Sequence, residues 1–214
     1  IPDIYDRADA IVNAWYPGEE GGRAIAEILF GDVNPSGKLT VTIPKHVGQI
    51  PLFYNHKPSA RGAHYKSFGS PEKPGRSYTA LDPYPYFEFG FGLSYTSFKY
   101  SSLKVSVSEN GVTRVSVDVE NTGDRSGKEV AMIYVNDKVS SVTTPVKALK
   151  GFKKILLNPG ERKTVIFELG FDELYLVDDN MKKTVEAGSF EVMIAGLRGE
   201  FTLSKAQCNI LNCR

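Results

Sequence analysis

The sequence predicts a mainly β protein, in which a short strand–helix–strand piece of an α/β unit precedes an immunoglobulin- or fibronectin type III-like β-sandwich. Two observations support this prediction. Between residues 99 and 205, β-rich segments alternate with tight-turn sequences, and roughly seven strands in about a hundred residues are typical of such sandwiches. Before residue 45, one apolar run and one amphipathic helix pattern flank a glycine-rich turn.

The composition is that of a globular protein with a sizeable core. Of 214 residues, 41% are hydrophobic, and 26 Lys and Arg nearly balance 25 Asp and Glu. This balance provides no attraction toward nucleic acid or anionic lipid, and no apolar run reaches the roughly 18 residues of a membrane span. Because Ile1 begins in ordinary sequence without a leader pattern, we expect a soluble chain processed or cut from something longer.

The first 45 residues have the pattern of the end of an α/β unit. Residues 10–15 form a mostly apolar run suited to a strand covered on both faces. The glycine-rich turn 17–22 then leads into residues 24–30, whose apolar side chains fall on one helical face, and Gly31 stands where a helix C-cap favours a left-handed residue. We therefore expect a strand, a loop and a helix.

A second strand is expected immediately after this helix. Asn34-Pro35-Ser36-Gly37 is a strong turn signal, and residues 38–43 alternate with the period of two that is typical of strands. So few elements cannot form a domain by themselves. We expect this segment to dock onto the rest of the chain or onto something outside it.

The next segment, residues 46–98, is expected to have little regular structure. Prolines and glycines interrupt it throughout, and tyrosines and phenylalanines are frequent. Exposing so many rings to water is unfavourable, so we expect an ordered belt that wraps over a surface and buries them.

From residue 99 onward the pattern is all-β. Turn signals at residues 109–111, 121–124 and 158–161 separate the β-rich runs. The expected strands are residues 103–108, 113–120, 129–135, 146–156, 163–169 and 189–195. The sandwich is expected to occupy residues 99–205, and residues 206–214 form a C-terminal tail.

Two carboxylates on the glycine-rich turn are the first candidate for a ligand site. Glu19 and Glu20 follow a predicted strand, where α/β folds place ligands. They would repel a phosphate, whereas carboxylates accept hydrogen bonds from sugar hydroxyls. The simpler interpretation is that they favour the positive helix N-terminus electrostatically.

Aromatic side chains are the second candidate, because sugars stack their C–H faces on aromatic rings. Trp15, Tyr16, Phe53, Tyr54 and Tyr65 could serve as such platforms, with Trp15 adjoining the two glutamates. For the dense run at residues 84–95 we expect an interface between the two halves instead.

No metal site and no cofactor motif is expected. The loop histidines His46, His56 and His64 have no carboxylate or cysteine partners nearby. Cys208 and Cys213 lie close together in the tail, and the sequence leaves open whether they form a local disulfide or two free thiols. No nucleophilic triad can be assembled either.

Several segments together resemble the C-terminal part of glycoside hydrolase family 3, in its bacterial β-glucosidase branch. They are WYPGEEGGRAIAEILFGDVNPSGKL at 15–39, VGQIPLFYNHK at 47–57, FGFGLSYTSF at 89–98, LKGF at 149–152 and NPGE at 158–161. Thr40 and Glu88 stand where the family usually has proline, and residues 64–82 fit the pattern poorly.

The resemblance implies an enzyme with a barrel, an α/β sandwich and a fibronectin type III-like domain that removes terminal sugars with retention of configuration. The catalytic Asp and Glu would lie upstream of this chain, which alone would be inactive. Residues 1–45 would be the end of the α/β sandwich and 46–98 the connector. The remainder of the glycosidase and a β-glucoside would be its partners; a homodimer is left open.

Three alternatives remain open at this point. The enzyme could be a β-xylosidase or have dual specificity, or the chain could be a non-catalytic carbohydrate-binding or structural β-sandwich module. Family habit implies a secreted, periplasmic or vacuolar location.

Overall fold

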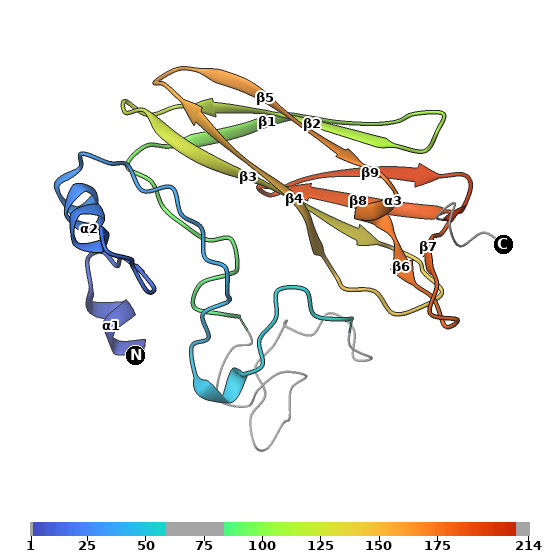
Figure 1. The fold of residues 1–214 in the computed structure, drawn as a ribbon, viewed down its shortest axis with the longest axis horizontal. Helices are drawn as coiled ribbons and strands as arrows, with labels where there is room; N and C mark the ends of the chain where they lie inside the picture. Colours follow the sequence, from blue (N-terminus) through green and yellow to red (C-terminus); the bar gives the residue numbers. More distant parts are fainter. Residues whose placement is uncertain (1, 59–83, 209–214) are drawn as a thin grey trace, which may run out of the picture.

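The computed structural model describes residues 2–58 and 84–208 and consists of a β-sandwich with the N-terminal segments along one side (Figure 1). Two helices lie at one end of the sandwich, and the connecting segments run beneath it. The predicted fold class is therefore confirmed: the chain is mainly β, with antiparallel sheets and a short helical part at its N-terminus.

The helices of the N-terminal part are α1 (Pro2–Arg7) and α2 (Gly21–Phe30). Helix α2 matches the predicted helix, and Gly31 ends it in the left-handed conformation at φ 83°. Helix α1 was not predicted, because six residues are too few to establish an amphipathic period.

The two strands predicted in this part are corrected by the structure. Residues 10–15 form no regular structure, because a strand needs a hydrogen-bonded neighbour and the described residues provide none there. Residues 38–43 form only an isolated antiparallel bridge, between Ile43 and Phe87. Hydrogen bonds between the backbones of Leu39 and Phe91 (2.8 Å) and of Gly90 and Leu39 (2.8 Å) extend this contact.

The sandwich consists of two main antiparallel sheets, ordered β1-β2-β5 and β4-β3-β8-β9. All six predicted strands are present in it, with ends shifted by a few residues. The strands are β1 (Phe98–Val107), β2 (Thr113–Asn121), β3 (Gly127–Asp137), β4 (Ala148–Leu157), β5 (Arg162–Leu169), β8 (Gly188–Ile194) and β9 (Leu197–Leu203). Strand β9 was missed because Arg198, Gly199 and Glu200 interrupt its apolar pattern.

Smaller elements close one end of the sandwich. Helix α3 (Phe171–Leu174) follows β5 and leads into a short sheet of β6 (Leu176–Val177), β7 (Lys183–Val185) and β10 (Gln207–Cys208). The 3-10 helix η1 (Val47–Gln49) is the one helical turn in the connecting segment among the residues described. Cys213 lies outside the described residues, so its pairing with Cys208 stays open.

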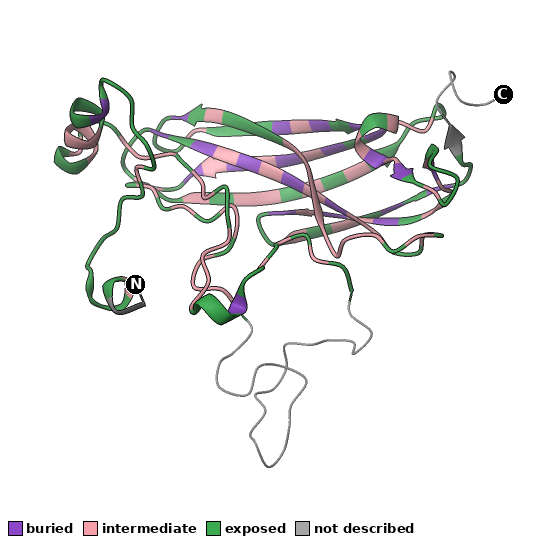
Figure 2. Ribbon diagram, turned by 60° about the horizontal axis from the view of Figure 1, so that its bottom comes forward, coloured by how far each residue is buried: buried purple, intermediate pink, exposed green. Residues whose placement is uncertain are grey.

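The core lies between the two sheets, where alternate residues of β2, β3, β5 and β8 are buried (Figure 2). Val115, Val117 and Val119 of β2 face the other sheet, in which Ile133 and Val192 are also fully buried. This alternation is the period of two on which the strand predictions depended. The sandwich therefore has its own hydrophobic core.

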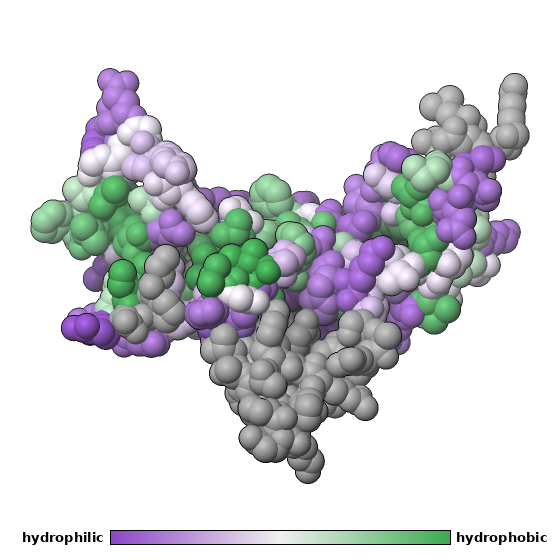
Figure 3. Space-filling model, turned by 90° about the horizontal axis from the view of Figure 1, so that it is seen from below, coloured by the Kyte–Doolittle hydropathy of each residue, from purple (hydrophilic) through white to green (hydrophobic). Residues whose placement is uncertain are grey.

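The N-terminal part, in contrast, exposes large apolar side chains. Tyr16 is 100% exposed, Phe30 85% and Leu29 65%. Figure 3 shows hydrophobic side chains gathered at the end of the molecule that carries the helices. Among the described residues, no helix has both the length and the apolar character needed to cross a membrane.

Candidate functional site

Glu19 and Glu20 lie on the glycine-rich turn before α2, and Trp15 lies directly before this turn. Gly21 donates its N–H to the Gly18 carbonyl at 2.9 Å, which closes the turn. Trp15 precedes the turn with φ at 51°, an unusual backbone conformation for a bulky residue, and its N–H donates to Asn13 Oδ1 at 3.2 Å. The Trp15 side chain is 54% exposed and could meet a ligand.

Glu19 and Glu20 are both exposed on this turn. Glu20 is the N-cap residue of α2, and its carbonyl accepts the N–H of Ala24 at 3.0 Å. Its side chain makes no capping hydrogen bond. Both carboxylates are thus available to accept hydrogen bonds from sugar hydroxyls, and both also lie near the positive end of the helix dipole.

The aromatic candidates divide into two groups. Tyr54 is packed in an interface: its ring stacks on Phe89 with centroids 4.1 Å apart, and its hydroxyl accepts the N–H of Leu149 at 3.3 Å. Phe53, like Trp15, is largely exposed. Tyr65 lies outside the described residues, so its role stays a prediction.

The rings of the connecting segment pack against one another, but several of them stay 40–54% exposed, so the predicted burial of these rings is only partial. Phe87 stacks on Phe91 at 4.9 Å, and Tyr5 of α1 lies edge-on to Phe87 at 5.4 Å. The Tyr86 hydroxyl also donates to the carboxylate of Asp6. This part of the belt therefore joins the N-terminal helix to the connecting segment.

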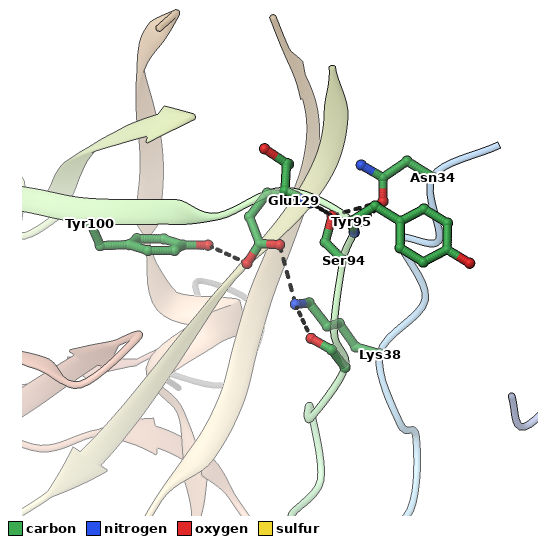
Figure 4. A network of polar contacts seen from close by, with 8 residues as sticks. Asn34, Lys38, Ser94, Tyr95, Tyr100 and Glu129 are labelled. Carbon is green, nitrogen blue, oxygen red and sulfur yellow. Dashed lines mark hydrogen bonds and ion pairs between the residues drawn. The ribbon is translucent and has the colours of Figure 1, made fainter. Parts of the chain in front are cut away.

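A polar network, which we term the clasp, joins the Asn34–Gly37 turn to the sandwich (Figure 4). Asn34 Oδ1 accepts hydrogen bonds from the Ser94 hydroxyl and the Tyr95 N–H, both at 2.8 Å. Asn34 Nδ2 donates to the Ser126 carbonyl at 3.1 Å. One turn side chain thus contacts both the connecting segment and the chain entering β3.

The charged part of the clasp is an ion pair with little access to water. Lys38 Nζ lies 3.2 Å from Glu129 Oε2 and donates to the Gly92 carbonyl at 3.0 Å. The Tyr100 hydroxyl donates to Glu129 Oε1 at 3.0 Å. Burial, together with the Glu129 carboxylate, raises the pKa of Tyr100 far above its usual value and keeps the hydroxyl a donor.

Close backbone approach accompanies these contacts. A Cβ atom on Gly92 would lie 2.3 Å from the Gly37 carbonyl oxygen, so only glycine fits at this position. The segments that resemble the family at residues 15–39 and 89–98 therefore meet in space. The contacts between these two segments hold the N-terminal part against the chain that enters the sandwich.

The sequence did not single out Glu129 or Tyr100. One signal was available: Glu129 occupies the same face of β3 as the buried Ala131 and Ile133, and a carboxylate in that register requires a partner. The partner, Lys38, lies far away in the sequence, and no local pattern connects the two.

His46 has a structural role. Its Nδ1 accepts the Gly48 N–H at 3.0 Å, and its ring caps η1. Over residues 2–58 and 84–208, no group of three His, Cys, Asp or Glu side chains is arranged to hold a metal ion. His64 lies outside the described residues.

Comparison with known families supports the assignment suggested by the sequence motifs. Residues 2–95 match the glycosyl hydrolase family 3 C-terminal domain, and residues 129–197 match the fibronectin type III-like domain.

Individual relatives cover most of this chain but only a part of their own length. A β-xylosidase of Formosa agariphila is 46% identical over 195 residues, which are 89% of this chain and 25% of that protein. A periplasmic β-glucosidase of Salmonella typhimurium is 45% identical over 88% of this chain and 25% of that protein. The chain thus spans about a quarter of the length of these relatives.

Solved structures give the same result. A β-glucosidase of Erythrobacter marinus is 41% identical with a TM-score of 0.83, over 94% of this chain and 26% of that one. A β-glucosidase of Listeria innocua in complex with gluconolactone is 34% identical with the same TM-score, over 94% of this chain and 28% of that one. The chain belongs to glycosyl hydrolase family 3. It matches that family's C-terminal domain and, further along the chain, the fibronectin type III-like domain.

Proposed function

We propose that the chain is the C-terminal portion of a retaining, exo-acting β-glucosidase that hydrolyses terminal β-glucosyl residues, with the catalytic Asp and Glu upstream of this chain. The main support is the likeness to β-glucosidase structures over 94% of the chain at 34–41% identity. In this proposal, residues 1–45 end the α/β sandwich, 46–98 connect, 99–205 form the fibronectin type III-like domain and 206–214 are a tail.

The remainder of the glycosidase is the proposed partner of the exposed apolar surface. Tyr16, Leu29 and Phe30 are each at least 65% exposed, which is unfavourable for side chains of this size in water. The relatives are about four times longer than the chain, so an enzyme of this family has ample chain to cover them. Whether the assembled enzyme forms a homodimer is left to sedimentation analysis.

Within the enzyme, the turn before α2 is the proposed point of sugar contact in this chain. Trp15 offers an exposed ring, and Glu19 and Glu20 offer carboxylates without hydrogen bonds to other described residues. Their role would be to bind substrate hydroxyls, and catalysis would depend on groups upstream.

An assay with an aryl β-glucoside tests this proposal. The full-length protein should release the aryl group, while the isolated 214-residue chain, at equal molar concentration, should not. Full hydrolytic activity of the isolated chain would contradict the proposal, because the catalytic carboxylates would then have to lie within it. If the full-length protein is inert, the non-catalytic carbohydrate-binding or structural module becomes the better assignment.

A β-xylosidase or a dual-specificity enzyme is the second candidate. The β-xylosidase and β-glucosidase relatives are 46% and 45% identical to the chain, so overall similarity favours neither substrate. Initial rates of the full-length protein on aryl β-glucoside and aryl β-xyloside separate the two. The primary proposal expects a higher kcat/KM on the glucoside.

The proposed location is outside the cytoplasm, in the periplasm, the medium or a vacuole. One relative is named a periplasmic β-glucosidase, which supports this location. Fractionation of source cells, followed by detection of the protein with an antibody, tests it.

A further inference from the structure

A cavity of about 400 Å³ lies at the end of the sandwich that is closed by α3 and β6. Apolar side chains, including Val142, Leu174 and Leu176, form much of its wall. Asp137 and Lys150 contribute polar groups to the same wall. Its volume is in the range of small-molecule sites, and Figures 1 and 2 place this end opposite to helix α2.

The carboxylate of Asp137, in the wall of this cavity, has one oxygen that accepts no hydrogen bond from the described residues. Its Oδ1 atom is buried and has no hydrogen-bond partner among the described residues, a condition that only Thr113 Oγ1 shares there. Burial raises the pKa of Asp137, the Val139 N–H opposes this shift, and Glu186 adds to it. A buried oxygen without a donor is unfavourable, and a ligand hydroxyl would relieve it.

Lys150 is an unused donor in the same wall. It projects from β4 and makes no hydrogen bond or ion pair to the residues described, and burial lowers its pKa although Glu173 opposes this. The cavity therefore combines an apolar surface with two polar groups unpaired among the described residues, the acceptor Asp137 Oδ1 and the donor Lys150.

The charges of the wall favour neither kind of ion. Asp137 and the nearby Glu186 are opposed by Lys150 and Lys57, so neither an anion nor a cation gains a net attraction. A hydroxyl group can both donate and accept, so a neutral polyol satisfies Asp137 and Lys150 together. We propose that this cavity of the fibronectin type III-like domain binds a small neutral saccharide, as a second site remote from the turn before α2.

Titration of the isolated 214-residue chain tests this site without interference from substrate turnover. Cellobiose and xylobiose are added to millimolar concentration, and binding is followed by chemical-shift changes in NMR spectra. Asp137→Ala and Lys150→Ala should each weaken binding at least tenfold. The matched controls Asp124→Ala and Lys154→Ala, at exposed positions of the same domain, should change it less than twofold.

A third variant guards against loss of folding. Thr143 is exposed and lines the cavity, so Thr143→Trp should block the cavity while the core stays intact, as checked by circular dichroism. Saturable binding that disappears in this variant supports the proposal. Absence of binding to the wild-type chain, or binding that all three cavity variants retain, overturns it. Neither result depends on whether the full-length protein hydrolyses glucosides.

Discussion

Lys38 and Glu129 form an ion pair in which both side chains are nearly excluded from solvent, at 15% and 10% exposure. Lys38 follows the turn after α2, and the side chain of Glu129 lies on the face of β3 that is directed toward the core. Charges placed so deeply are unfavourable without a partner. The pair therefore makes the N-terminal part and the sandwich depend on each other.

Replacing Glu129 by Gln should be strongly destabilising, because it leaves the Lys38 ammonium without a counter-charge. We expect a loss of about 3–5 kcal/mol in the free energy of unfolding, measured by urea denaturation. The control is Glu168→Gln, which breaks an exposed pair with Arg114 and should cost less than about 1 kcal/mol. Equal losses would show that the clasp pair has no special role.

Gly92→Ala should separate the two backbones that meet in the clasp. The new Cβ would lie 2.3 Å from the Gly37 carbonyl oxygen, and we expect a loss of about 1–3 kcal/mol in thermal or chemical unfolding. Gly37→Ala is the control, because a Cβ there meets nothing within 4 Å. A stable Gly92→Ala variant would refute the close approach.

Tyr134 should make the stability fall in alkaline solution. Burial first, then Tyr54 and Glu88, raises its pKa from 10.0 to about 12. Between these values the unfolded chain loses the proton while the folded chain keeps it, so stability decreases as pH rises. Urea denaturation at stepped pH should show a shallower decrease for Tyr134→Phe than for wild type.

The control for this pH profile is Tyr16→Phe, at a fully exposed ring. Its slope above pH 10 should match that of the wild-type protein. If Tyr134→Phe and Tyr16→Phe both leave the slope unchanged, burial does not perturb the Tyr134 hydroxyl.

The double variant Glu19→Gln and Glu20→Gln in the full-length protein should raise KM for cellobiose about tenfold or more, with a smaller change in kcat. Each carboxylate would lose charged hydrogen bonds to substrate hydroxyls. If the glutamates only favour the helix N-terminus, KM stays constant and the melting temperature falls slightly. Glu27→Gln, within α2, is the matched control.

Phe30→Ala should have different effects in the two forms of the protein. In the isolated chain the ring is 85% exposed, so we expect a change within about 0.5 kcal/mol. In the full-length protein, where the proposed α/β sandwich covers α2, the loss should be about 3 kcal/mol or more. Equal small effects in both forms would argue against burial of this face.

The sequence predicted the sandwich well because its information is local. Val115, Val117 and Val119 alternate with polar residues, and turn signals separate the strands, so six strands were found. Residues 10–15 have an equally apolar pattern, yet they form no strand, because strand formation requires a neighbour that the described residues do not supply. An apolar sequence pattern indicates that a segment tends to be buried, but whether it forms a strand depends on a neighbouring strand with which it can form hydrogen bonds.

The candidate site was less predictable. Glu19 and Glu20 were predicted from their place on a glycine-rich turn after an apolar run, and Trp15 from its aromatic ring. The clasp was missed because Lys38 and Glu129 meet only after the chain has folded, and Asp137 and Lys150 meet at one cavity from two different strands. Such pairings depend on tertiary contacts, which periodicity does not encode.

The backbone hydrogen bonds that tie Leu39 to Phe91 and Ile43 to Phe87 have a consequence for variation in length. They pair backbone positions that lie before and after the connecting residues 44–86, so this pairing does not depend on how many residues separate the two positions in the sequence. Relatives whose chains differ in length between these positions should therefore keep the same backbone pairing next to the sandwich.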